Sequence, residues 1–213
     1  VGLDLDSPFE DFFLGDSHYV MGEKVEGPMD FSKKNFMSIP DQHKFLIQLI
    51  FPTENNFKNK LSLSESDRKY ILSKMSMLPR QSTYPDYNSK FTDGYCKFFM
   101  FGDTKAKIPD HIKIFNKVGL AYGFVLDNAY IIDLKHNIEF FLTAVVYGNE
   151  NRVLNDNIYD YDTQTIPFLA ELGNAIYLYE KGREKKYTSD LSYFGRLWAW
   201  KTIAWYVFNY LDQ

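Results

Sequence analysis

The chain has 213 residues, 45% of them hydrophobic and 18% aromatic, which is ample material for one sizeable packed domain. A net charge of −4 argues against nucleic-acid binding, which requires a basic surface stripe. One cysteine, Cys96, excludes an intrachain disulfide framework, and no segment approaches the roughly 20 apolar residues that span a bilayer.

The N-terminal segment, residues 1–30, is expected to be a loop-rich lead-in, because Gly15, Gly22, Gly27 and Pro28 interrupt it. The sequence begins at Val1 and shows no basic region followed by an apolar stretch, so it contains no recognisable signal peptide. We interpret this start as that of a processed or truncated product, and a signal peptide upstream stays open.

Two helices are predicted next. The first covers residues 41–50, where apolar residues recur at helical spacing, and Pro52 ends it. The second follows Ser64, whose hydroxyl can cap the helix beginning ESDRK. Its apolar stripe is formed by Ile71, Leu72, Met75 and Leu78.

Residues 112–147 contain three β-rich runs: IKIFNKVGLAYGFV, NAYIIDL and IEFFLTAVVY. The pair Asp127-Asn128 reads as a turn between the first two runs, and residues 135–137 as a hairpin turn between the last two. The third run is apolar on both alternating faces, which is typical of a strand covered on both sides. The sequence therefore predicts an antiparallel meander between layers of helices.

A final helix is predicted from Thr165, with Pro167 in its first turn and Gly182 as its end. Its expected packing face is formed by Leu169, Leu172, Ile176 and Tyr179. The aromatic C-terminal tail, residues 184–213, contains all three tryptophans. Residues 197–211 are apolar all round a helix, so they are expected to be buried or to contact a partner or a membrane surface.

Lys117 lies in an otherwise apolar and aromatic run, FNKVGLAYGF, over residues 115–124. A desolvated ammonium group is costly, so this lysine needs a partner or a function. One interpretation is a strand-end lysine whose charge pairs with Asp127 or Asp133. The other is a catalytic strand, on which Lys117 and Gly119 serve a nucleophile located elsewhere.

Four segments occur in an informative order: LSLSESDRKYILSKM, FNKVGLAYGFVLDNAYIID, IEFFLTAVVY and IPFLAELGNAIYLYEKGR. They resemble the late helix, the Lys-Thr-Gly strand with its hairpin partner, the next strand and the C-terminal helix of the serine β-lactamase and penicillin-binding-protein superfamily. Residues 31–183 are thus similar to the C-terminal half of that domain, and most similar to the class A β-lactamase-like serine hydrolases.

The resemblance implies a role for each residue of the short strand motif. Lys117 would bind a substrate carboxylate and supply positive potential, and Gly119 would let the substrate backbone lie along the strand edge. The N–H of Leu120 would be half of an oxyanion hole. Val118 departs from the family pattern, because a threonine or serine hydroxyl that contacts the substrate carboxylate is replaced by an alkyl group.

The nucleophile that the resemblance requires is not found in a suitable context. The family places Ser-x-x-Lys at the start of a buried helix, so that the lysine can take the serine proton. The match here, from Ser66 to Lys69, lies in a polar first turn and too close to Lys117 to leave room for a helical subdomain. We interpret it as a capped surface helix.

No cofactor or metal site is predicted. The four histidines, His18, His43, His111 and His136, are scattered singly without the spacing of a zinc site.

The predicted fold is a layered α/β (α+β) domain, with an antiparallel sheet flanked by helices and without the N-terminal part that carries the nucleophile. The predicted function is the C-terminal portion of a serine hydrolase acting on amide or ester bonds of β-lactams or peptidoglycan peptides, inactive as an isolated chain. A non-catalytic module that binds a ligand or a protein is the alternative. By resemblance the location is periplasmic or extracellular, and the oligomeric state stays open.

Overall fold

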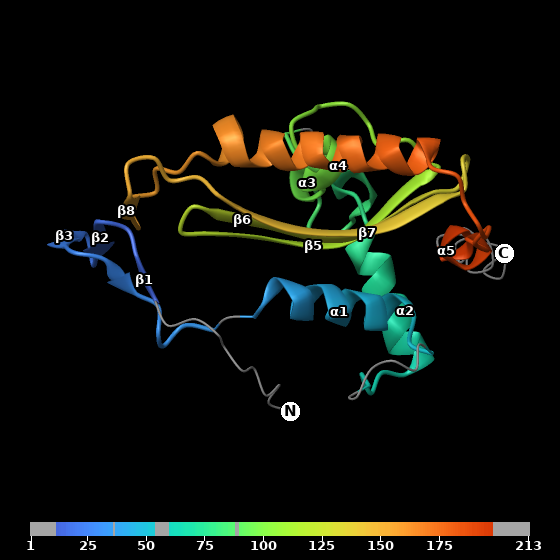
Figure 1. The fold of residues 1–213 in the computed structure, drawn as a ribbon, viewed down its shortest axis with the longest axis horizontal. Helices are drawn as coiled ribbons and strands as arrows, with labels where there is room; N and C mark the ends of the chain where they lie inside the picture. The colour runs from blue at the N-terminus through green and yellow to red at the C-terminus, as the bar shows by residue number, and fades with distance from the viewer. Residues whose placement is uncertain (1–11, 36, 54–59, 88–89, 198–213) are drawn as a thin grey trace, which may run out of the picture.

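The computed structural model describes residues 12–35, 37–53, 60–87 and 90–197. Its centre is an antiparallel sheet in the order β5-β6-β7, and helices cover both of its faces (Figure 1). The three strands are β5 (Ile112–Ala121), β6 (Phe124–Asp133) and β7 (Ile138–Tyr147). The predicted mixed α+β class, with helices packed on an antiparallel sheet, is therefore confirmed.

A different pair of helices covers each face of the sheet. One face of the sheet is covered by the long α4 (Ile166–Gly182) and the short α3 (Phe98–Phe101). The opposite face is covered by α1 (Ile39–Ile50) and α2 (Glu65–Met75). The sheet is thus the middle layer of three.

Short elements complete the described chain. The segment expected to be loop-rich holds the short strands β1 (Phe13–Leu14), β2 (Ser17–Val20), β3 (Glu23–Glu26) and β4 (Met29–Asp30). β2 pairs antiparallel with β3 and parallel with β8 (Val153–Leu154). The remaining short helices are η1 (Pro79–Gln81), η2 (Asp93–Cys96), η3 (Tyr161–Thr165) and α5 (Ser192–Arg196).

The turn between the first two long strands lies where the sequence did not predict it. Tyr122 and Gly123 form a two-residue turn, both with positive φ (54° and 86°), as tight hairpins between twisted strands require. The prediction of a turn at Asp127-Asn128 is wrong, because both residues are buried inside β6. The predicted turn at residues 135–137 is confirmed, with Asn137 at a φ of 51°.

Each face of the sheet contributes to a separate hydrophobic core. Ile114, Val125 and Ala129 pack with Leu169 of α4 and with Phe99. On the other face, a second core contains Phe115, Tyr130 and Ile132 together with Leu46 of α1 and Leu72 of α2. The prediction that the central strands are covered on both sides is therefore confirmed.

The helix ends largely follow the sequence signals. The Ser64 hydroxyl accepts the N–H of Asp67 at 3.1 Å, as predicted, and α1 ends two residues before Pro52. Tyr179 is 65% exposed, so its predicted place on the packing face of α4 is wrong, and Tyr177 packs against the core instead.

The predicted partner-binding or membrane segment, residues 197–211, lies outside the described residues except for Leu197. No helix in the described part of the chain is long and apolar enough to cross a membrane.

We expect Gly173→Ala to destabilise the layer of α3 and α4. A Cβ atom at Gly173 would lie 2.6 Å from the backbone nitrogen of Met100 and 2.8 Å from the Cβ of Phe99. Relieving such overpacking costs about 1–3 kcal/mol, which urea unfolding would measure. Gly182→Ala is the matched control, because no other described residue beyond its chain neighbours and its own helix backbone lies within 4 Å of the added methyl group. An equal loss in both variants would contradict the packing argument.

Candidate functional site

The four residues of the predicted strand motif, Lys117 to Leu120, lie together near the end of β5. Side chains alternate between the faces of a strand, so Lys117 and Gly119 share the α1–α2 face with buried Phe115. Val118 faces the opposite core, beneath α3 and α4. The replacement of a hydroxyl-bearing residue by valine therefore affects the side of β5 away from Lys117.

The register of the β5–β6 hairpin decides which backbone groups of β5 face away from β6. Ala121 pairs with Phe124 across the two-residue turn, and at the other end the N–H of Leu134 donates to the carbonyl of His111 at 2.9 Å. Odd-numbered residues of β5 therefore exchange hydrogen bonds with β6, and even-numbered ones direct their N–H and C=O groups outward. Within the described residues no strand pairs with that outer side, so the N–H of Leu120 lies on an open edge.

An apolar hollow lies beside Lys117, between the sheet and the two helices α1 and α2. Its volume is about 340 Å³, and we call it the α1–α2 hollow. Apolar side chains make most of its wall: Met37, Phe45, Leu49, Ile71, Met75 and Leu126. Lys117, Gln42 and Asn128 supply its polar groups. Apolar walls with a few polar groups are typical of sites for small organic ligands.

The Lys117 ammonium group is exposed and has no acidic partner among the described residues. Its Nζ donates only to the carbonyl of the adjacent Val118, at 2.5 Å. The expected pairing with Asp127 or Asp133 does not occur, because each of these carboxylates is buried with other partners. Lys117 therefore carries a positive charge at the rim of the hollow that the described chain does not neutralise.

Asn128 lies directly opposite Lys117 in the register and forms a polar chain along the floor of the hollow. Its Nδ2 donates to the carbonyl of Gln42 at 2.9 Å, and its Oδ1 accepts the hydroxyl of Thr143 at 2.7 Å. The Nδ1 of His43 lies 2.8 Å from the same hydroxyl oxygen. The sequence analysis missed this residue because Asp127-Asn128 looked like a turn, although apolar residues flank the pair on both sides.

A buried polar network supports β5 from the opposite face. Lys97 is only 1% exposed, and its Nζ donates to the carbonyl of Met75 at 2.5 Å and to Oδ1 of Asn116 at 2.6 Å. Nδ2 of Asn116 in turn donates to Oδ1 of Asp127 at 2.8 Å. The other carboxylate oxygen of Asp127 accepts the N–H groups of Phe98 and Phe99. Asn116, the residue next to Lys117, is thus held between the side chains of Lys97 and Asp127.

Burial shifts both ionisable groups of this network toward their neutral forms. It lowers the pKa of Lys97 to about 8 and raises the pKa of Asp127 to about 6, although their mutual attraction works in the opposite direction. The network therefore costs desolvation energy that its hydrogen bonds offset.

The Ser-x-x-Lys match at Ser66 lies in the first turn of α2. Ser66 is exposed, its hydroxyl lies 2.8 Å from that of Ser64, and Lys69 pairs with Glu65 at 3.4 Å. This confirms the interpretation of the segment as a capped surface helix.

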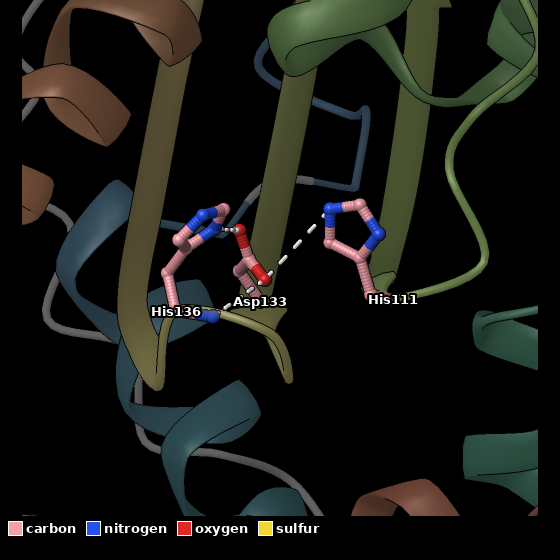
Figure 2. Close-up of side chains that lie close together, drawn as sticks. All are labelled: His111, Asp133 and His136. Carbon is pink, nitrogen blue, oxygen red and sulfur yellow. Dashed lines mark hydrogen bonds and ion pairs between the residues drawn. The ribbon is translucent and has the colours of Figure 1, made fainter.

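The histidines are less scattered than the sequence suggested. His18 and His43 stand apart, but His111 and His136 lie on either side of the Asp133 carboxylate (Figure 2).

Comparison with protein-family models, with curated proteins and with solved structures finds no match to this chain.

We expect Lys97→Met to destabilise the fold by about 3 kcal/mol, because removing one partner of a buried charged network leaves the others unpaired. The carbonyl of Met75 and Oδ1 of Asn116 would both lose their donor. Urea unfolding at pH 7 measures the loss, and the exposed Lys105→Met serves as the control, with a change within about 0.5 kcal/mol.

The stability difference between wild type and Lys97→Met should also depend on pH. Because the pKa of Lys97 is lowered to about 8 from 10.5, the unfolded chain holds a proton between these values that the folded chain has lost. The contribution of Lys97 to the free energy of unfolding therefore rises with pH in this window. We expect wild type to gain stability relative to Lys97→Met between pH 7.5 and 9.5. A constant difference would show that Lys97 keeps an ordinary pKa.

Proposed function

We propose that this chain is the C-terminal portion of a β-lactamase-like serine hydrolase that cleaves amide or ester bonds through an acyl-enzyme. The α1–α2 hollow and the outer edge of β5 would form one side of its substrate cleft. The observation that carries the proposal is Lys117, a cation with no acidic partner in the described part of the chain, at the rim of an apolar hollow and beside an open strand edge.

Each group on β5 has a chemical use in such a cleft. The Lys117 ammonium group would attract an anionic substrate and stabilise negative charge that develops during acyl transfer. The N–H of Leu120, directed to the open edge, would donate to the carbonyl oxygen of the scissile bond. The outward carbonyl and N–H of Val118 are suited to pairing with an extended substrate backbone, as in the addition of a strand to a sheet edge.

Gly119 keeps the approach to this edge clear. Apart from its chain neighbours, a methyl group added there would meet no atom of the described residues closer than 3.8 Å, so packing among them does not explain the absence of a side chain. On the α1–α2 face the methyl group would instead occupy space beside Lys117. This supports a role for Gly119 in admitting a substrate.

The substrate class follows from the walls of the hollow. A small molecule or a peptide with an apolar portion and a negative charge fits apolar walls beside a single ammonium group. Val118 lacks the hydroxyl of the family pattern, and its side chain packs against the opposite core, so recognition of a carboxylate would depend on Lys117 alone. We therefore favour ester or amide substrates that do not require a second contact to a carboxylate.

The nucleophile would come from a segment outside these 213 residues, and the chain by itself would be inactive. Ser66 is unsuitable, because the base it would need, Lys69, pairs with Glu65 on an exposed helix. The coding sequence upstream of Val1 provides a direct test. The proposal expects a Ser-x-x-Lys motif in an apolar helix, and an unrelated domain in that place would contradict it.

A non-catalytic binding module is the second candidate, favoured by the apolar character of the hollow. Its ligand would enter the same space, but no bond would be cleaved. The two candidates differ in what Lys117 does, because a binding module uses it for affinity alone.

We expect Lys117→Ala in the complete protein to lower the rate of acylation by a fluorophosphonate about 10²-fold, the scale of losing one electrostatic contact to the transition state. Peptide mass spectrometry identifies the acylated serine, and the exposed Lys105→Ala is the control. Acylation at Ser66 would refute the assignment of the nucleophile. Unchanged acylation combined with weaker ligand binding would favour the binding module.

Gly119→Ala separates the function of this edge from its stability. Because the added methyl group meets no close contact among the described residues, the free energy of unfolding should stay unchanged or rise by about 0.4–1 kcal/mol. Hydrolysis of a p-nitrophenyl ester by the complete protein should nevertheless drop at least tenfold. Full activity in this variant would show that no substrate lies along β5.

A further inference from the structure

A second group of functional side chains lies at the opposite end of the sheet from the hollow. His111 immediately precedes β5, Asp133 is the last residue of β6, and His136 lies in the turn before β7. Six residues separate His111 from Lys117 along the extended strand, which corresponds to about 20 Å. The group is therefore independent of the cleft described above.

The Asp133 carboxylate is fixed at the centre of this group. It is 1% exposed, and its Oδ1 accepts the N–H groups of Lys135 and His136 at 2.8 and 3.1 Å. Its Oδ2 accepts the Tyr177 hydroxyl of α4 at 2.7 Å. Burial alone would raise the pKa of Asp133, but these bonds and the one to the His136 ring together lower it to about 2, so the group is ionised.

The two imidazole rings flank this carboxylate and remain accessible to solvent (Figure 2). Nδ1 of His136 lies 2.7 Å from Oδ2, and Nε2 of His111 lies 3.9 Å from Oδ1. About a third of each side chain is exposed, 36% for His111 and 35% for His136. The ring centroids are 6.1 Å apart, and the planes meet at 76°.

We propose that His111, Asp133 and His136 form a binding site for a divalent transition-metal ion of the Zn²⁺, Co²⁺ or Ni²⁺ type. One donor atom from each residue lies within 4.8 Å of the other two. Metal–ligand bonds of about 2.0–2.2 Å at tetrahedral angles place two ligand atoms roughly 3.3–3.6 Å apart, so rotation of the exposed rings would be needed to complete the set.

The donor types select the class of ion. Imidazole nitrogen suits zinc, cobalt and nickel, whereas calcium and magnesium prefer sites made entirely of oxygen. Two histidines and one carboxylate leave at least one coordination position for water on the accessible side. On binding, the ion takes the place of the hydrogen bond between His136 and Asp133. The Tyr177 hydroxyl and the two backbone N–H groups continue to hold the carboxylate, as outer-shell partners of metal ligands do.

A bound ion would connect the start of β5 with the end of β6 and the turn before β7. Because these three points come from different strands, the ion would stabilise one end of the sheet against fraying. Ligand binding to the folded state raises the unfolding temperature with ligand concentration, so at a hundredfold excess over the Kd several degrees are expected.

The test uses the chain without a histidine tag and measures Zn²⁺ binding by calorimetry at pH 7.5. Co²⁺ provides a visible absorption spectrum that reports on coordination. We expect one equivalent of Zn²⁺ to bind, and His111→Gln and His136→Gln each to weaken binding at least tenfold. Tyr177→Phe should weaken it by a smaller factor, because it removes only an outer-shell bond. His18→Gln is the matched control, since His18 bonds to the carbonyl of Gly27, away from this site.

Circular dichroism and melting curves without metal establish that each variant is folded. The expected pattern is a rise in melting temperature with Zn²⁺ for wild type and His18→Gln that disappears in the His111→Gln/His136→Gln double variant. The proposal is overturned if wild type binds no Zn²⁺, if the double variant binds it equally well, or if Mg²⁺ binds as tightly as Zn²⁺.

Discussion

The register of the hairpin formed by β5 and β6 is the constraint on which the rest of this structure depends. A shift of one residue would exchange the two faces of β5, moving both Phe115 and the charged Lys117 to the face beneath α3 and α4. It would also exchange inward and outward backbone groups, so the N–H of Leu120 would turn toward β6. Both cores and the open edge of the candidate cleft therefore require the same pairing, from Ala121 with Phe124 to Ile112 with Asp133.

Two features independent of hydrophobic burial maintain this register. The turn at Tyr122 and Gly123 places two consecutive residues at positive φ. A shifted register would move this backbone conformation onto other residues of the hairpin. Asn116 and Asp127, one on each strand, are joined by a hydrogen bond and held by Lys97 and by the backbone of α3. A slipped strand would leave these buried polar groups without partners, at a cost of about 1–3 kcal/mol for each. The network thus penalises alternative pairings more than it stabilises the native one.

The sequence was informative where a signal is local. The Ser64 cap, the prolines, the helical spacing of apolar residues and the two-sided apolar pattern of IEFFLTAVVY predicted the helices, the sheet and its covered faces. It was misleading at Asp127-Asn128, because a polar pair between apolar runs is more often a turn than a buried network, and the partner Lys97 lies 30 residues earlier. For the same reason the sequence could not bring His111 and His136 together: 25 residues separate them, and the strand pairing that aligns them follows from the correct position of the turn.

The two ends of the sheet combine rigidity with different exposed chemistry. At the Lys117 end, a cation without an acidic partner among the described residues lies with outward backbone groups beside an apolar hollow, where another molecule can pair with them. At the Asp133 end, the carboxylate is already satisfied by four donors, so an incoming ion must compete with one hydrogen bond but meets preorganised ligands. Ten-residue strands connect the two ends, so fixing the pairing at one end also fixes which residues pair at the other. A metal ion that prevents fraying near His111 would therefore also help to hold the register that directs the N–H of Leu120 outward.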